Sequence, residues 1–297
     1  ARVCLAENAV PVTDPHAVLQ VALAAAQNSA RIEGRTLEAL AVAPVLSDPW
    51  PASAQKLFVE LLRHGSASIP VIETLDQFGL WTPLIPEWAP CRSLPQRNVF
   101  HHYTVDRHLL ECSAEAASLA HRTPRPDLLV IAALLHDIGK AYSGDHSEVG
   151  MQLTTGIASR MGFDSEDRAT LEFLVLNHLL LSEIATRRDL DDPATIEGVA
   201  KIVETPDRLA LLRALSEADG VSTGETSWGP WKAQLVEQLS SRVANLLNGV
   251  EDLSERSSFP NDEQRLLMQT PGIHISVQGE RITVVCPDRL GAFFRVA

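Results

Sequence analysis

The stretch LLVIAALLHDIGK, residues 128–140, places an apolar run directly before a histidine and an aspartate. The run 128–135 is apolar on every face, which predicts a helix buried on all sides. His136 and Asp137 follow at once, and both are costly to bury unless they are paired or bind a metal ion. Consecutive residues lie about 100° apart around a helix, so these two can reach one ion only with partners from other helices. The alternative is an ordinary polar helix end.

The composition indicates a mainly helical protein. Of the 297 residues, 45% are hydrophobic and only 5% are aromatic. Ala and Leu, which favour helices, outnumber the aromatic and branched residues on which β-rich domains depend. Ser165 and the Asp192-Pro193 pair are expected at helix starts. The predicted helical stretches are 15–48, 53–65, 69–80, 104–120, 126–139, 146–162, 165–185, 193–203, 208–223 and 231–247.

Charge and cysteine usage narrow the possible partners. The net charge of −13 repels phosphate backbones and disfavours a nucleic-acid partner, but bound metal cations would still allow a small phosphorylated substrate. Cys4, Cys91, Cys112 and Cys286 are too widely spaced for a disulfide framework or a zinc motif, which indicates reduced thiols and a cytoplasmic location. No uninterrupted apolar run approaches the ~18 residues that span a bilayer, so no membrane association is expected.

The sequence changes character near residue 250. The polar stretch 251–264 reads as a linker, and residues 273–297 give two strand-type runs, a Pro-Asp-Arg turn and the start of a helix. A helical body is therefore followed by the opening of a small α/β module. The chain begins on Ala1 and ends in an unfinished apolar pattern, so we expect a piece of a longer protein.

Histidines and carboxylates interrupt several of the predicted apolar helix faces. Each one alone is more often a satisfied core or surface residue than a ligand. Six of them at the core-facing positions of separate helices are hard to obtain by chance, and a metal site explains the joint pattern. The set is His108, His136, Asp137, His146, His178 and Asp219.

These residues carry a family resemblance. ALLHDIGK (133–140) resembles the signature of the HD-domain metal-dependent phosphohydrolases. Over about residues 70–297 the chain is similar to one branch of them, the bifunctional PII uridylyltransferase/uridylyl-removing enzymes. The segments that carry this similarity are residues 95–111, 133–150, 174–196, 228–239 and 281–297.

The resemblance implies an HD-domain helical bundle followed by the start of an ACT domain, which has a ferredoxin-like fold. The implied boundaries are a helical linker region (1–69), the HD domain (70–250), a second linker (251–270) and a truncated ACT domain (271–297). Gly65-Ser66 has no following Asp-x-Asp, which the transferase half of the family requires. We therefore expect only the nucleotidyl-removing half in this chain.

The resemblance also implies the reaction and the partners. The family's HD domain hydrolyses a nucleotidyl-tyrosine phosphodiester on the PII signal protein and releases UMP, or AMP in an actinobacterial variant, which the composition resembles. ACT domains imply glutamine sensing by the full-length enzyme. The matching metal ligands are His108, His136, Asp137 and Asp219, with His146 and His178 for a second ion and Asp137 as the bridge. A ligand set so rich in imidazole suits one or two Mn, Fe, Co or Zn ions better than Mg.

Asp137 and Lys140 are the expected catalytic residues. Lys140 would contact a phosphate oxygen or assist the leaving tyrosinate, the alternative being a solvated helix end. Either Arg187 or Arg188 would bind phosphate or the partner protein.

Whichever of Arg187 and Arg188 does not bind phosphate or the partner would pair with Asp189 or Asp191. Asn177 and Tyr103 are further candidates for substrate binding. Two other functions remain open: hydrolysis of a free nucleotide by the same type of site, and a non-catalytic HD module that senses a ligand.

Overall fold

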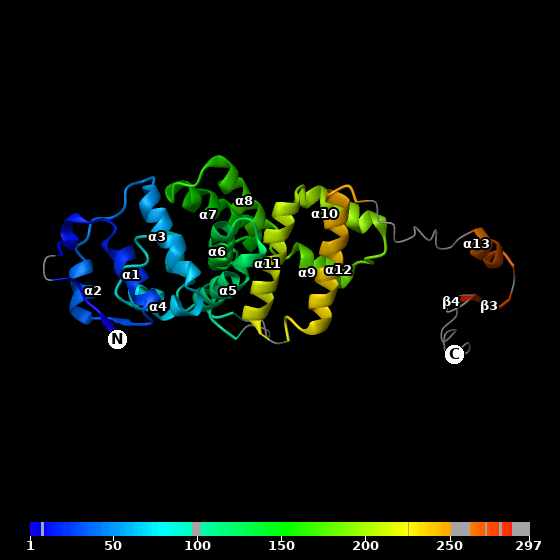
Figure 1. Ribbon diagram of the computed structural model, residues 1–297, viewed down its shortest axis with the longest axis horizontal. Coiled ribbons are helices and arrows are strands. Elements are labelled where there is room, and N and C mark those ends of the chain that lie inside the picture. The colour runs from blue at the N-terminus through cyan, green and yellow to red at the C-terminus, as the bar shows by residue number, and fades with distance from the viewer. Residues whose placement is uncertain are drawn as a thin grey trace. The chain divides into compact units, whose positions relative to one another are not determined.

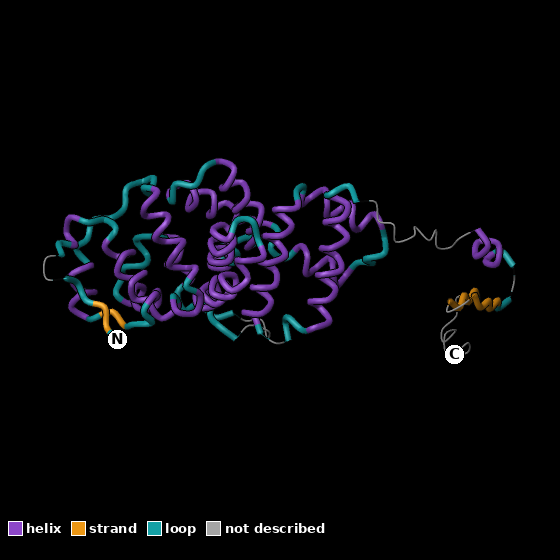
Figure 2. The backbone as a smooth tube through the Cα atoms, in the orientation of Figure 1, coloured by secondary structure: helices purple, strands orange, loops and turns teal. Residues whose placement is uncertain are grey.

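The computed structural model describes residues 1–6, 9–96, 102–224, 226–250, 262–270, 272–278 and 281–286. The chain divides into two compact units, residues 1–248 and 249–297. Helices make up most of the described part of the first unit, as the composition predicts (Figure 2).

Four helices lie together at the N-terminal end of the first unit (Figure 1, blue and cyan). A short parallel pair of strands joins residues 2–3 to residues 31–32 beside them. Gly65 and Gly79, which follow the ends of α3 and α4, adopt the positive φ angles of 60° and 70° that favour glycine. The elements are β1 (Arg2–Val3), α1 (Ala17–Gln27), β2 (Arg31–Ile32), α2 (Gly34–Leu40), α3 (Ala52–Arg63) and α4 (Ile69–Gln77).

The central helix α6 confirms the prediction from the opening stretch. Every residue from Leu128 to Leu135 is buried. The helix packs against α5, α8, α11 and α3, so no face is left for water. The helices of this central group are α5 (Val105–Leu119), α6 (Pro126–Leu135), α7 (His146–Arg160), α8 (Ser165–Leu176) and α11 (Pro206–Thr223), followed in space by α9 (Leu180–Arg187), α10 (Pro193–Val203) and α12 (Pro230–Leu247) (Figure 1).

The end of α6 differs from the sequence prediction. The helix ends at Leu135 rather than 139, and a 3-10 turn, η5 (Ile138–Ala141), follows Asp137. Gly139 lies inside this turn and does not end the helix. A Cβ at Gly139 would lie 2.1 Å from the His146 carbonyl oxygen and 2.6 Å from the Gly150 nitrogen. Glycine is therefore what lets η5 lie against α7.

The predicted helix 165–185 is two helices. A turn over residues 177–179 separates α8 from α9, and it brings His178 to the end of α8. The N-cap of α8 is Asp164 rather than Ser165, because Asp164 Oδ1 accepts hydrogen bonds from the backbone N–H groups of residues 166 and 167. At α10, Asp192 caps the helix before Pro193 as predicted.

The sequence prediction considered only uninterrupted apolar runs, and it therefore missed one stretch that is long and apolar enough on average to cross a membrane. Residues Ser165–Arg187 are long and apolar enough by composition, although polar residues interrupt the run. In the folded unit α8 packs on α7 and α6 and buries Leu171, Leu174 and Val175, which is the behaviour of a core helix.

The second unit contains α13 (Asp262–Met268) and an antiparallel hairpin of β3 (His274–Gln278) and β4 (Arg281–Val285). The hairpin confirms the two predicted strand runs at the start of a ferredoxin-like fold. Its cross-strand pairs Ile275–Val284 and Val277–Ile282 form an apolar face. The predicted Pro-Asp-Arg turn and the following helix start, residues 287–297, lie outside the described residues.

We predict that Gly139→Ala destabilises the first unit by about 3 kcal/mol, because the methyl group would meet backbone atoms that cannot rotate away. The matched control is Gly156→Ala in α7, the helix against which η5 packs. Gly156 is exposed within α7 and has open space around it, so alanine there should stabilise by about 0.5–1 kcal/mol. Chemical denaturation of the three proteins measures both effects, and equal stabilities would contradict the packing argument.

Candidate metal centre

Helix ends and one helix interior bring all six predicted ligands together. Four of the side chains are almost fully buried, with 0–2% of the residue surface exposed, while the side chains of His146 and Asp219 are 30% and 19% exposed. The ligands are His108 on α5, His136 and Asp137 after α6, His146 at the start of α7, His178 after α8 and Asp219 on α11. The cluster is therefore buried on one side and open at His146 and Asp219.

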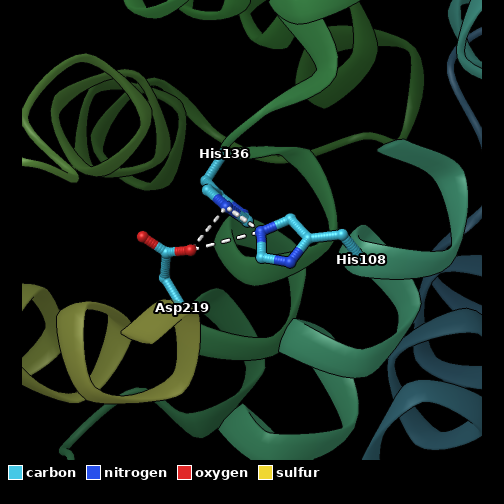
Figure 3. A group of neighbouring side chains, drawn as sticks. All are labelled: His108, His136 and Asp219. Atoms are coloured by element: carbon cyan, nitrogen blue, oxygen red, sulfur yellow. Dashed lines mark hydrogen bonds and ion pairs between the residues drawn. The ribbon is translucent and has the colours of Figure 1, made fainter. Parts of the chain in front are cut away.

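The first triad consists of His108, His136 and Asp219, and the three side chains point toward one another from three elements (Figure 3). The two Nε2 atoms lie 3.2 Å apart. Asp219 Oδ1 lies 3.2 Å from His108 Nε2 and 3.5 Å from His136 Nε2. Atoms that converge so closely can all bind one ion.

Asp137 forms the second triad with His146 and His178 and also borders the first. Its Oδ1 lies 3.7 Å from His146 Nε2 and 3.6 Å from His178 Nε2. Its Oδ2 lies 3.4 Å from His136 Nε2 and 3.5 Å from His108 Nε2. The two oxygens of one carboxylate thus face two different triads, which is the arrangement that a bridging ligand requires.

The histidine tautomers fit metal binding. His136 Nδ1 lies 2.9 Å from the Ala133 carbonyl oxygen, and His178 Nδ1 lies 2.8 Å from the Val175 carbonyl oxygen. A carbonyl only accepts, so each Nδ1 carries the hydrogen. In the neutral ring, Nε2 then presents its lone pair to the centre, as in metal-bound histidines.

The carboxylate of Asp137 gives an independent test of fit. Its Oδ1 is buried and has no hydrogen-bond donor among the described residues. A buried carboxylate oxygen without a partner is costly, and nearby imidazole lone pairs cannot satisfy it. A divalent cation would satisfy both the carboxylate oxygen and the imidazole lone pairs. The imidazole-rich donor set suits Mn, Fe, Co or Zn.

Charge inside the cluster shifts its pKa values in opposite directions. Burial alone would raise the pKa of Asp137, but His136, Lys140 and His178 outweigh it and hold that pKa well below the ordinary range. Burial would also raise the pKa of Asp219, but hydrogen bonds and charge from His108 and His136 outweigh it and hold that pKa well below the ordinary range. Burial lowers the pKa of His178, whereas Cys112 and Asp137 overcome burial and raise the pKa of His136 well above its ordinary value.

Lys140 lies at the edge of the centre. Its Nζ is 2.5 Å from Asp137 Oδ2 and donates a hydrogen bond to Gln96 Oε1 at 2.8 Å. The side chain is 24% exposed. Lys140 is thus held against the bridging carboxylate and does not extend into solvent from a helix end.

The predicted substrate-binding residues lie outside the two triads. Arg187 and Arg188 are exposed, and Arg187 pairs with Glu183 at 3.4 Å. The expected pairing of one of them with Asp189 or Asp191 is wrong, because the partner of Asp191 is Arg242 at 2.6 Å.

Asn177 donates to the Phe173 carbonyl of its own helix at 2.9 Å. Tyr103 is 40% exposed and lines a cavity beside the centre.

Sequence reasoning missed two residues that support the site. Ser222 Oγ lies 3.5 Å from His108 Nδ1 and donates to the Asp219 carbonyl oxygen at 3.0 Å. The spacing of Ser222 from Asp219, one turn of α11, is a signal that could have identified it. Gln96 lies in a loop far from Lys140 in sequence, and no local pattern points to it.

Comparisons with known proteins agree with this geometry. Residues 105–223 match the HD domain family. A bifunctional uridylyltransferase/uridylyl-removing enzyme of Streptomyces coelicolor is 47% identical over 89% of this chain and 32% of its own length. Enzymes of the same name from Mycobacterium tuberculosis and Gluconobacter oxydans are 43% and 39% identical over 99% and 71% of this chain, and 37% and 24% of their own lengths. The chain spans about a third of the length of the first two relatives.

We predict that Asp137→Asn loses most bound metal, because the amide cannot supply two anionic oxygens. Mn²⁺ should stabilise the unchanged protein by about 2.7 kcal/mol at a hundredfold excess over Kd and should leave the variant's melting temperature nearly unchanged. Asp191→Asn, an exposed carboxylate outside the centre, is the control and should respond like the unchanged protein. Elemental analysis and thermal melts measure both, and a full metal content in Asp137→Asn would contradict the bridging arrangement.

We also predict that metal affinity rises with pH. The raised pKa of His136 favours the protonated ring before an ion binds. The ion needs the Nε2 lone pair and must displace that proton, so affinity falls about tenfold per unit below the raised pKa and levels off above it. Calorimetric titration with Mn²⁺ in buffers of different ionisation enthalpy counts the released proton. Affinity that does not vary between pH 6 and 8 would contradict this assignment.

Proposed function

We propose that the chain belongs to the HD-domain family of metal-dependent hydrolases and that it removes a nucleotidyl group, UMP or AMP, from a tyrosine of the PII nitrogen-regulatory signal protein. The observation that carries this proposal is the bridging position of Asp137 between two triads. Two ions a few ångströms apart suit hydrolysis of a phosphodiester, because each can neutralise part of its charge. The relatives are uridylyl-removing enzymes by name, which supports the nucleotidyl-tyrosine bond as the substrate.

The chain's own residues prepare the centre for this reaction. When bound, a divalent ion supplies a hydroxide nucleophile near neutral pH by lowering the pKa of its water. His136 and His178 are locked by their backbone hydrogen bonds, so their Nε2 atoms need no reorganisation. Asp137 would fix the spacing between the two triads.

Lys140 is the one lysine that contacts the bridging carboxylate among the described residues. We assign it the task of placing positive charge beside the phosphate or the leaving tyrosinate. Tyrosinate is the conjugate base of an acid with a pKa of about 10, so a neighbouring ammonium would favour its departure. Gln96 would hold Lys140 in place while its charge is used.

The proposal extends to partners and regulation. Nucleotidylated PII would be the protein substrate, in the cytoplasm, with neither nucleic acid nor membrane involved. Glutamine would act through the ACT domains of the longer enzyme, of which residues 271–297 would be the beginning. Arg187 and Arg188 remain candidates for contact with PII, because both side chains are exposed.

The deciding experiment compares substrates on the Mn²⁺-loaded protein. We expect release of UMP or AMP from nucleotidylated PII, with His136→Ala abolishing turnover while the helical circular dichroism spectrum stays unchanged. A panel of free nucleotides is assayed in parallel by chromatography of the products. Turnover of free nucleotides alone would replace this function with that of a nucleotide phosphohydrolase. No turnover of any substrate with metal bound would favour a sensor module.

A further inference from the structure

A cavity of about 480 Å³ lies beside the metal centre. Side chains of α5 and of the end of α11, together with the residues just before α5, line it. Its volume falls within the range of small-molecule sites, about 300–1,000 Å³. The lining residues used below are His102, Tyr103, Glu111, Glu115 and Ser222.

Ser222 links the cavity to the first metal triad. Ser222 lines the cavity and also contacts His108 and the Asp219 carbonyl group. On α5, residues His108, Glu111 and Glu115 follow at i, i+3 and i+7, so one face of the helix serves both places. A ligand with one end at the triad can therefore extend into the cavity.

The chemistry of the cavity is unsuited to phosphate. None of the described residues that line it is a lysine or an arginine, and its two glutamates, Glu111 and Glu115, outnumber its one histidine, His102. Arg107 approaches from outside the lining, with its guanidinium 5.7 Å from the centre of the Tyr103 ring. Arg107 is already paired with Glu73 at 2.7 Å and with Glu111 at 2.8 Å.

Because Glu111 pairs with Arg107, Glu115 is the lining carboxylate available for a ligand. Within α5, Ser118 Oγ donates a hydrogen bond to Glu115 Oε1 at 3.3 Å, and Glu115 Oε2 has no hydrogen bond with the described residues. A carboxylate accepts hydrogen bonds from hydroxyl groups, and an exposed tyrosine ring stacks on planar rings. A sugar with free hydroxyls joined to an aromatic base satisfies both requirements.

We propose that this cavity holds the nucleoside part of the substrate, with the ribose hydroxyls donating to Glu115 and the base lying against Tyr103, while the phosphate reaches the metal triad. This assignment rests on the proposed nucleotidyl-removing function. Stacking tolerates any base, so Tyr103 would anchor uracil and adenine alike.

The test measures binding of the reaction products to the Mn²⁺-loaded 297-residue chain by calorimetry. Glu115→Gln and Tyr103→Ala should each weaken UMP and AMP about tenfold. Tyr103→Phe keeps the ring, and Glu197→Gln changes an exposed glutamate on α10, so both should bind like the unchanged protein. Binding of inorganic phosphate should be the same in all five proteins.

The ligand can be altered in place of the protein, which removes any effect of a variant on folding. UMP lacking the 2′ and 3′ hydroxyls should bind the unchanged protein about tenfold more weakly than UMP, and Glu115→Gln should cause no further loss. Equal affinity of both ligands for the unchanged protein, or an equal loss of phosphate binding in the variants, would overturn the assignment. So would the absence of any UMP or AMP binding.

The outcomes separate this inference from the function on which it rests. Nucleotide binding with the expected dependence on Glu115, but no release of a nucleotide from PII, would defeat the proposed function and leave the cavity as a nucleotide site. Release from PII with no effect of Glu115→Gln or Tyr103→Ala on KM or on product binding would defeat the cavity assignment alone.

Discussion

The structure depends on one buried carboxylate. Asp137 follows a helix that is buried on every side, and one of its oxygens has no donor among the described residues. Such an arrangement is unfavourable without a cation, because a carboxylate removed from water needs compensating charge or hydrogen bonds. The rigid helix α6 prevents the carboxylate from turning to solvent, so the same packing that stabilises the fold holds the ligand in place.

The acidic character of the chain fits this centre. A net charge of −13 would repel an anionic phosphodiester. Within the centre, however, four imidazoles and Lys140 surround two carboxylates, so divalent ions would make the local field positive. Attraction of the phosphate would then be confined to the centre, while the glutamates of the adjoining cavity would keep the phosphate out of the nucleoside position.

Residue patterns that are local in sequence predicted the structure well. The apolar run 128–135, the helix start at Asp192 and the strand runs after residue 272 were all identified because periodicity and capping act over a few residues. The errors lie where backbone contacts between distant segments decide the outcome. The helix was predicted to continue to residue 139, but Gly139 lies in η5 and allows its close approach to α7, which no single segment reveals.

The candidate site shows the same contrast between residues that a sequence pattern predicts and residues that it does not. Six candidate ligands, which the structure brings together, were predicted jointly because histidines and aspartates interrupt apolar faces, and because a family resemblance was available. Ser222 and Gln96 were missed, since a serine or a glutamine interrupts no pattern. The HD signature likewise indicates the metal ligands but not the molecule that would bind beside them. Under the proposed function that choice would fall to residues such as Tyr103, which precedes α5, and Glu115, two turns beyond His108 on α5.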